Sequence, residues 1–337
     1  MSEDITGHRP LIIAGSGISG LSAAIYAARA NNEPLVFEGD EPGGQLTLTT
    51  EVENYPGIDE SVSGSELIQQ MKNQAEKFGT EIQHGIIETI DDSERPFTVT
   101  LENGDIYTCD ALIAASGASA KTLGVPGENE LFGYGVSSCA TCDGAFFRGE
   151  EMLVVGGGDA AAEEATFLTK FASKVYVAQR RDELRAEGYL RDRLLEKEEE
   201  GEIEILWNTE VEEITGTKED GVHKVNLVKH QDGYPKKKLE EGESVERDEL
   251  EVGAVFLAIG HTPNTEYLED TEVLLDDDNY IIVENGRGGG KTKTGVEGLF
   301  AAGDVVDHHY QQAATASGMG VMAAMDANDY LEDFDDE

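Results

Sequence analysis

Basic residues are scarce in this chain of 337 residues, which contains 25 lysines and arginines against 69 aspartates and glutamates. The net charge of −44 makes nucleic acid and anionic membrane surfaces very poor partners. Long apolar segments are missing as well: no run of about 18 apolar residues occurs, so we expect no membrane span. Residues 1–10 contain no basic stretch leading into an apolar run, which predicts no secretory signal and a cytoplasmic protein.

The surplus of acid has three possible readings, which the distribution of the acidic residues separates. Disorder is the first, but glycine-rich motifs and apolar strand patterns extend through the chain. An acidic interaction tail is the second, yet only residues 332–337 resemble one. The third is a folded protein in concentrated salt, where a Debye length of about 3 Å at roughly 1 M screens self-repulsion. The composition therefore favours an origin in a halophilic archaeon.

Cysteine is rare too, and two of the three cysteines stand three residues apart, at Cys139 and Cys142, with Asp143 directly behind. At the start of a helix such residues lie about 5–6 Å apart, which suits a disulfide, and helix N–H groups favour a thiolate. Asp143 is placed to carry the proton that thiol–disulfide chemistry moves. The alternative is half of a structural zinc site, which needs four ligands. No second CxxC exists and the nearest histidines are His84 and His223, so we expect a redox pair and no metal.

Residues 11–38 show the pattern of a dinucleotide-binding unit. An apolar strand at residues 11–14 leads into a GxGxxG motif formed by Gly15, Gly17 and Gly20. An alanine-rich helix at residues 21–30 and a second strand at residues 34–37 follow, and the strand ends at the acidic Glu38. The glycines permit a tight turn and a close approach of a pyrophosphate to the helix N-terminus. Glu38 stands where a carboxylate meets the hydroxyl groups of an adenosine ribose.

The same pattern returns at residues 152–178, with a helix to about residue 171 and a glycine-rich turn that contains Gly156, Gly158 and Ala161. The position that corresponds to the acid is the neutral Gln179. Three basic residues follow it, Arg180, Arg181 and Arg185. Guanidinium groups accept a 2′-phosphate, whereas an acid selects NAD. The alternative is a solvated basic face, but five of the eleven arginines fall between residues 180 and 193. We therefore expect NADPH at this second unit.

Two dinucleotide units and one CxxC imply a relay from NADPH through a flavin to a disulfide. Residues 294–304 read as a turn, a strand and a pair, Gly303 and Asp304, of the kind that meets the ribityl chain of a flavin. We expect an α/β fold with two Rossmann-like domains of the three-layer ββα type, the NADPH domain inserted into the FAD domain. The expected domains are residues 1–121 and 250–337 for FAD and 122–249 for NADPH, with joints at 124–128 and 252–260. Residues 231–249 read as a surface hairpin without chemistry.

Further short motifs accompany these features in a fixed order. They lie at residues 16–20, 43–46, 50–57, 115–117, 139–144, 180–185, 260–264, 302–304 and 312–313. Over nearly its whole length the chain thus resembles the low-molecular-weight thioredoxin reductases. The glutathione and lipoamide reductase branch carries a CxxxxC in the first FAD segment, where this chain has Gly43, Gly44 and Gln45. Two positions depart from the family's pattern: Gln179 replaces a histidine before the arginines, and Gln311 replaces an arginine.

The resemblance implies a site for each cofactor. The FAD site should include Gly15, Gly17, Gly20, Glu38, Gly43, Gly44, Gln45, Asn54, Gly303, Asp304, Gln312 and Ala313. The NADPH site should include Gly156, Gly158, Ala161, Arg180, Arg181 and Arg185. Cys139 and Cys142 should be the redox pair and Asp143 the acid/base. The resemblance also implies thioredoxin or a similar small dithiol protein as partner, and a homodimer in which the NADPH domain swivels.

The expected activity is thioredoxin-disulfide reduction. Hydride passes from NADPH to FAD and on to the Cys139–Cys142 disulfide, and one thiolate then exchanges with oxidised thioredoxin. Two alternatives use the same scaffold: a flavin-dependent oxidase of small dithiols, and a flavin redox sensor without turnover. The arginines at 180–185 argue against the first, and in the second Asp143 has no task. Cys109 begins an apolar strand and should be buried and inert.

Overall fold

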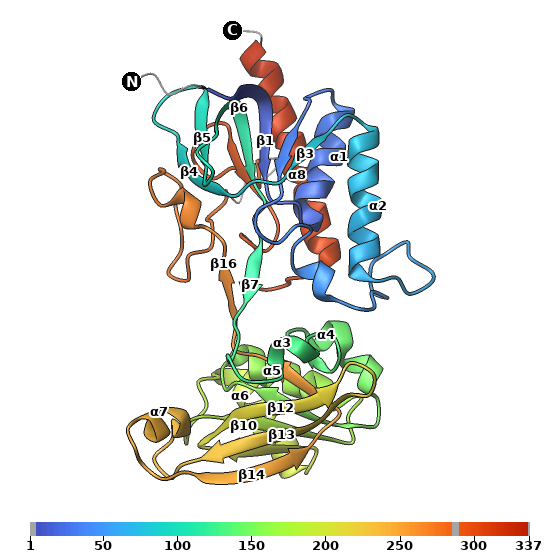
Figure 1. Ribbon diagram of the computed structural model, residues 1–337, viewed down its shortest axis with the longest axis vertical. Helices are drawn as coiled ribbons and strands as arrows, with labels where there is room; N and C mark the ends of the chain where they lie inside the picture. The colour runs from blue at the N-terminus through green and yellow to red at the C-terminus, as the bar shows by residue number, and fades with distance from the viewer. Residues whose placement is uncertain (1–4, 285–289, 336–337) are drawn as a thin grey trace. The chain divides into compact units, whose positions relative to one another are not determined.

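The chain forms two units, of which unit 1 combines both end segments and unit 2 is one continuous piece. The computed structural model describes residues 5–284 and 290–335. Unit 1 comprises Met1–Ser119 and His261–Glu337, and unit 2 comprises Ala120–Gly260 (Figure 1). Within the described residues no helix is both long and apolar enough to cross a membrane.

A seven-stranded sheet organises the described part of unit 1. Its strands are, in spatial order, β3 (Glu81–Gln83), β2 (Leu35–Phe37), β1 (Gly7–Ala14), β6 (Ile106–Ala114), β5 (Phe97–Leu101) and β4 (Ile87–Asp91), with β17 (Leu299–Ala301) beside β6. Strands β1, β2, β3, β6 and β17 run parallel, whereas β4 and β5 pair antiparallel. The end of β1, Leu11–Ala14, is buried on both faces, as is usual for a central parallel strand.

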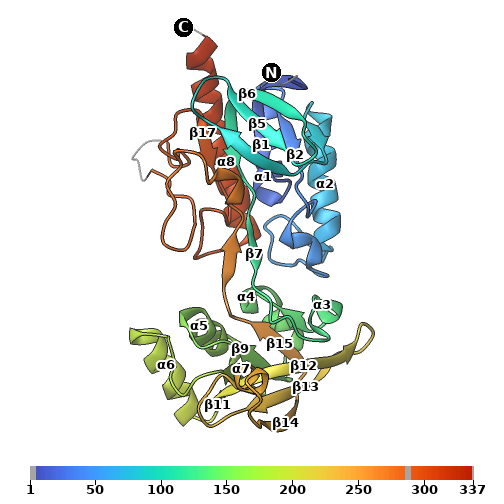
Figure 2. The same ribbon diagram turned by 60° about the vertical axis from the view of Figure 1, so that its left-hand side comes forward.

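Both faces of this sheet are covered, which gives three layers. One face packs against α1 (Ile18–Arg29), α2 (Gly64–Lys77) and α8 (Ala313–Asp335) (Figure 2). On the other face, side chains of β4 and β5 form a second core with Leu268 of the short helix η3 (Glu266–Leu268) and with Val273, Ile281, Leu299 and Val305. Helices α1 and α8 lie side by side, with Ser22 Oγ and Ser317 Oγ hydrogen-bonded at 2.8 Å.

Unit 2 repeats this plan with different parts. Its parallel sheet is β11 (Ile203–Trp207), β10 (Lys174–Gln179), β9 (Glu151–Val155), β15 (Ala254–Leu257) and β8 (Val136–Ser137). One face packs against α4 (Ala140–Asp143), η2 (Gly144–Phe147), α5 (Asp159–Leu168) and α6 (Gly188–Glu199). The other face is covered by the antiparallel sheet β12 (Thr209–Thr217), β13 (Gly221–Lys229) and β14 (Glu246–Glu251), with α3 (Glu128–Leu131) and α7 (Pro235–Glu240) beside it. The expected α/β fold with two Rossmann-like three-layer units is confirmed.

The first passage between the units precedes the segment 124–128, and the second directly follows the segment 252–260. The segment 124–128 belongs to unit 2, because buried Glu128 accepts hydrogen bonds from the backbone N–H groups of Leu123, Gly124 and Val125. Strand β15 also belongs to unit 2, because it pairs with β9 and β8, so this unit extends beyond residue 249 to Gly260. The two connecting strands, β7 (Ala118–Ala120) and β16 (His261–Pro263), pair with each other.

Candidate active site

The CxxC forms a disulfide at the start of the short helix α4. The sulfurs of Cys139 and Cys142 are 2.06 Å apart and the Cα atoms 5.3 Å apart, within the expected range. Cys139 has an extended backbone in front of the helix, and its carbonyl accepts the N–H groups of Cys142 and Asp143 at 3.2 and 3.1 Å. The helical turn thus brings the two sulfurs together, and both cysteines remain partly exposed.

Packing against helix α5 fixes the position of this disulfide in unit 2. Ala140, between the cysteines, is almost fully buried in the core of the sheet and α5. A Cβ at Gly144, after the helix, would lie 2.6 Å from a methyl carbon of Leu168, so this face of α4 lies directly on α5. Thr141, on the other side, is exposed. The disulfide is therefore carried by a rigid helix with one side open.

Asp143 lies next to the disulfide in surroundings that favour its protonated form. Burial raises the pKa of the Asp143 carboxyl, and a hydrogen bond with the side chain of Ser137 partly opposes this shift. Ser137 Oγ also accepts the backbone N–H of Cys139 at 3.0 Å. The same hydroxyl thus links the carboxyl to the start of the CxxC. A carboxyl whose pKa is raised can hold and release a proton closer to neutral pH.

The glycine-rich turns of the two units have the same local geometry. Gly15 follows β1 with a φ of +111°, and a Cβ there would lie 2.4 Å from the carbonyl oxygen of Ala115, at the end of β6. Gly156 follows β9 with a φ of +148°, and its Cβ would lie 2.3 Å from the carbonyl oxygen of Ala258, at the end of β15. Only glycine fits such a turn without displacing backbone. Each turn leads into a helix N-terminus, where an anion is favoured.

In unit 1, a second loop lies against the first glycine turn. Gly43 N–H donates to Ser16 Oγ at 2.9 Å, and a Cβ on Gly44 would lie 3.4 Å from the Cα of Gly17, the residue before helix α1. Gly20 lies in the first turn of that helix, against the backbone of Gly15. Gln45 begins the 3-10 helix η1 (Gln45–Leu48) directly after Gly44. The structure thus brings together the glycines that the sequence assigned to one flavin site.

A buried polar pair without partners marks the edge of the same region. The Oδ1 atom of Asp304 and the Oγ atom of Ser19 are buried, and neither has a hydrogen-bond partner in the described residues. Gly303 lies against Ser19, since a Cβ there would be 2.9 Å from that Oγ atom. Burial, and to a lesser degree Asp307, raises the pKa of Asp304 to about 7. A hydroxyl-bearing ligand such as the ribityl chain of a flavin would give both groups a hydrogen-bond partner.

The remaining residues assigned to this site are less closely joined to it. Glu38, at the end of β2, forms an ion pair with Lys72 from α2. Asn54 lies in an exposed stretch, and no hydrogen bond in the described residues ties it to the glycine turns. Gln312 donates through Nε2 to the carbonyl oxygens of Tyr310 and Gln311, at 3.1 and 3.2 Å. Ala313 begins helix α8.

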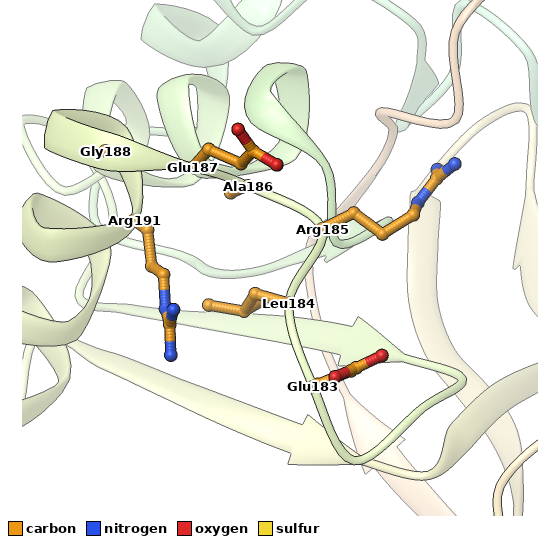
Figure 3. A pocket seen from close by; sticks show the side chains of 7 residues that line it. All are labelled: Glu183, Leu184, Arg185, Ala186, Glu187, Gly188 and Arg191. Carbon is orange, nitrogen blue, oxygen red and sulfur yellow. The ribbon is translucent and has the colours of Figure 1, made fainter.

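The arginines of unit 2 lie around its own glycine turn. The backbone N–H groups of Arg185 and Ala186 donate to the carbonyl of Gly157 at 2.6 and 3.0 Å. Gly158 precedes helix α5, and Ala161 lies in its first turn, packed against Gly156. A pocket of about 680 Å³ adjoins this loop and is lined by residues 183–188 and Arg191. In Figure 3 the guanidinium of Arg191 reaches past Leu184, while that of Arg185 points the opposite way.

Among the described residues these arginines have no acidic partner, although acid dominates the chain. In the segments 5–284 and 290–335, no carboxylate forms an ion pair with Arg180, Arg181 or Arg185. Gln179, by contrast, is buried, and its Nε2 donates to the carbonyl of Glu183 at 2.6 Å, which fixes the bend of the arginine loop. Three guanidinium groups are thus available for an anion from outside.

One neighbour of these arginines was missed by the sequence reasoning. The predicted hairpin at 231–249 is wrong in its first half, because helix α7 occupies Pro235–Glu240. Directly before it, the ring of Tyr234 lies 5.3 Å from the Cζ atom of Arg180 and 5.4 Å from that of Arg181. No local sequence pattern predicts this contact, because it joins residues more than fifty positions apart.

The comparison with known proteins settles the relationship that this geometry indicates. The sequence profile described as "Pyridine nucleotide-disulphide oxidoreductase" matches residues 9–320. A thioredoxin reductase of Rickettsia conorii is 47% identical over 321 residues, which cover 95% of this chain and 97% of the relative. The chain belongs to the pyridine nucleotide-disulphide oxidoreductase family.

Two further family members show how closely the fold is shared and how names vary within it. The solved structure titled "Thioredoxin reductase from Giardia duodenalis" aligns with a TM-score of 0.86 at 39% identity, covering 97% of this chain and all of that one. A Pseudomonas fluorescens protein named glucosaminate ammonia-lyase is 47% identical over 96% of this chain. Membership in the family is thus established along nearly the whole length.

Other reactive side chains lie apart from the residues described so far. Cys109 in β6 is free and fully buried, which confirms its expected burial, and this burial raises the pKa of its thiol. Within the described residues, no group of three or more His, Cys, Asp or Glu side chains is arranged to hold a metal ion. His308 and His309 instead have aromatic neighbours, Tyr280 and Tyr310.

Proposed function

We propose that this protein is an NADPH-dependent thioredoxin-disulfide reductase. The observation that carries the proposal is the Cys139–Cys142 disulfide beside a carboxyl whose pKa is raised, in a chain with two dinucleotide turns. The relatives named thioredoxin reductase, at 46–47% identity over 95% or more of the chain, support it. When bound, the cofactors would supply the chemistry of two-electron transfer from NADPH through FAD.

We assign the cofactors by the donors present in each unit. The glycine turns of unit 1 and the Asp304 Oδ1 atom, which has no partner in the described residues, favour FAD there, so unit 1 is proposed as the FAD domain. Arg180, Arg181 and Arg185, which form no ion pair within the described residues, favour the 2′-phosphate of NADPH in unit 2. All site residues named from the sequence keep these proposed roles, with Glu38 and Asn54 supported least by the geometry.

The chain's own residues perform the exchange with the protein substrate. Two electrons break the Cys139–Cys142 bond, and Asp143 is placed to supply a proton to one of the two resulting thiolates. The remaining thiolate attacks a sulfur of oxidised thioredoxin, whose disulfide breaks to give a mixed disulfide. The second thiol, deprotonated by Asp143, resolves this intermediate, releases reduced thioredoxin and restores the starting disulfide.

The test separates flavin reduction from disulfide exchange. In Cys142→Ser, NADPH should still reduce the bound flavin, but turnover with thioredoxin should be abolished. Cys109→Ala removes a buried thiol outside the site and should leave both steps intact. Thioredoxin turnover in Cys142→Ser would refute the relay. Oxygen consumption with small dithiols in the absence of NADPH would instead support the oxidase alternative, and ammonia release from glucosaminate the activity that the Pseudomonas fluorescens relative is named for.

We further propose a cytoplasmic homodimer that works in concentrated salt, with a halophilic archaeal origin. The charge of −44 supports the salt requirement. Exposed apolar side chains on the adjacent helices α1 and α8, namely Tyr26, Met322 and Met325, offer surface that a second copy would cover. The paired connecting strands β7 and β16 are where a swivel of the NADPH domain would be absorbed. Light scattering in concentrated salt tests the dimer.

A further inference from the structure

The turn before helix α7 places one aromatic ring against two neighbouring arginines. We define the Tyr234 turn as residues 230–235. The Tyr234 ring centre lies 5.3 Å from Cζ of Arg180 and 5.4 Å from Cζ of Arg181, within the range of cation–π attraction. Two guanidinium groups that share a ring in this way are both held near its face. A single residue thereby fixes the positions of two charged side chains.

Backbone hydrogen bonds bind the same two segments together. Tyr234 N–H donates to the carbonyl of Arg180 at 2.7 Å, and Asn208 N–H donates to the carbonyl of Arg181 at 3.1 Å. Asn208 in turn donates through Nδ2 to the carbonyl of Gln231 at 3.2 Å. The arginine segment is thus held by the Tyr234 turn from one side and by the end of β11 from the other.

The backbone of Tyr234 is itself unusual for a bulky residue. Its φ of +49° and ψ of +53° lie in the left-handed region, which side chains of this size rarely adopt. The preceding Gly233 is packed so closely that a Cβ would lie 2.9 Å from the Arg180 carbonyl oxygen. The chain therefore accepts local strain at the point where the ring meets the arginines, and such strain is concentrated at functional positions.

The contact also explains how two like charges can stay adjacent without carboxylates. Arg180 and Arg181 repel each other, and no ion pair in the described part of the chain offsets this repulsion. The face of an aromatic ring attracts the flat face of a guanidinium group, and the N–H groups along the edge of the guanidinium stay free. Those N–H groups are the ones that a phosphate accepts in bidentate fashion.

We propose that Tyr234 is a positioning residue that holds Arg180 and Arg181 in place for the 2′-phosphate of NADPH. The proposal rests on the proposed use of NADPH by unit 2. Tyr234 acts through the arginines and does not itself read the phosphate charge. Its removal weakens binding of ligands that carry a 2′-phosphate and leaves ligands without one unchanged.

The experiment compares two ligands that differ only by the 2′-phosphate, adenosine 2′,5′-bisphosphate and AMP, by calorimetry on the holoenzyme in concentrated salt. The test variant is Tyr234→Asn, because asparagine adopts the left-handed conformation readily and so preserves the backbone of the turn. The matched control is Tyr234→Phe, which keeps the ring and removes only the hydroxyl. A thermal melt of each variant establishes that unit 2 remains folded.

Tyr234→Asn should weaken the bisphosphate roughly tenfold and leave AMP unchanged, and Tyr234→Phe should bind both like the wild type. In turnover, the KM for NADPH should rise at unchanged kcat, while the KM for NADH should not move. Equal weakening of both ligands, or no weakening, would overturn the role of Tyr234. A wild type that does not prefer the bisphosphate over AMP would instead overturn the NADPH assignment itself.

Discussion

Three carboxyl groups of this protein, on Asp143, Glu164 and Asp304, have pKa values raised mainly by burial. They differ in what surrounds them. Asp143 borders the disulfide and has Ser137 as a partner, whereas Asp304 follows Gly303 and has one oxygen without a partner in the described residues. Glu164, on α5, has a buried Oε2 atom for which the described residues offer no partner, and it has no role in the proposed reaction. A raised pKa thus has a use at two positions and costs stability at the third.

Asp143→Asn should separate the two half-reactions of the enzyme. The amide cannot exchange a proton, so thioredoxin turnover should fall roughly 100-fold while NADPH still reduces the flavin at the wild-type rate. Stopped-flow absorbance measures the first step and steady-state NADPH consumption measures the whole cycle. Because its pKa is raised, loss of the proton from wild-type Asp143 should also lower turnover as pH increases, and the variant should lose this pH dependence. Unchanged turnover in Asp143→Asn would exclude the acid/base role.

Glu164→Gln should stabilise the protein, and more so at higher pH. The pKa of Glu164 is raised from 4.5 to about 8 by burial and by Glu163, so the folded state prefers the protonated form. Its contribution to stability is therefore fully present below pH ~4.5 and is lost as pH rises through about 8. At pH 8 we expect a gain of roughly 2–4 kcal/mol in the free energy of unfolding.

Thermal melts of wild type and Glu164→Gln between pH 5 and pH 9, in concentrated salt, measure this difference. Glu199→Gln makes the same chemical change at an exposed position of α6 and should have no pH-dependent effect. A stability gain that stays constant across the pH range would contradict the explanation.

At the scale of elements, both nucleotide turns were predictable because their signals are local. The strand, the glycines and the helix follow one another within about twenty residues, and the geometry at Gly15 and Gly156 agrees with that prediction. The end of unit 2 was not predictable in this way, because β15 is assigned by its pairing with β9 and β8. Helix α7 was missed since its sequence, PKKKLE, has no apolar periodicity. The Tyr234 contact depends on the folded positions of both segments.

The connection into unit 2 depends on one buried side chain at the start of helix α3. Glu128 is 1% exposed, and its carboxylate accepts the N–H groups of Leu123 and Gly124 at 2.8 Å each and of Val125 at 3.3 Å. Glu128→Gln replaces one acceptor oxygen with a donor that faces backbone donors. We expect unit 2 to lose about 2–3 kcal/mol of stability. Glu130→Gln, exposed on the same helix, is the matched control.

Denaturant unfolding of both variants, followed by the fluorescence of Trp207 in unit 2, measures this effect. The expected result is a lower midpoint for Glu128→Gln at an unchanged slope. Equal midpoints for Glu128→Gln and Glu130→Gln would show that the three hydrogen bonds are not stabilising.

For the whole molecule, the surplus of 44 negative charges is the dominant property. Even complete pairing of the basic side chains leaves these carboxylates without a partner, and several ion pairs, such as Lys237 with Glu241, are largely exposed. Exposed pairs contribute little to stability, so they do not offset the repulsion. Counterions from the solvent have to do so.

The melting temperature should therefore rise steeply as salt is added. In dilute buffer the Debye length is about 30 Å at 0.01 M, so carboxylates repel across a whole unit, whereas at 1 M it is about 3 Å. Melts over a sodium chloride series, with turnover measured at each point, provide the test. Sucrose at matched osmolality serves as control, because it stabilises compact states without screening charge. Full activity and an unchanged melting curve in dilute buffer would contradict the prediction.

Because unit 1 is split around unit 2, its two segments are synthesised on the ribosome at different times. Strand β6 is complete at Ala114, but its neighbour β17 and the covering helix α8 begin only at Leu299 and Ala313. Residues 120–260 contain all of unit 2, which can fold while the first half of unit 1 waits. At about 10 residues per second, the side of α1 that packs against α8 and the Leu112–Ala114 end of β6 that pairs with β17 stay uncovered for roughly 20 seconds. The nascent chain is thus most exposed to aggregation in this interval.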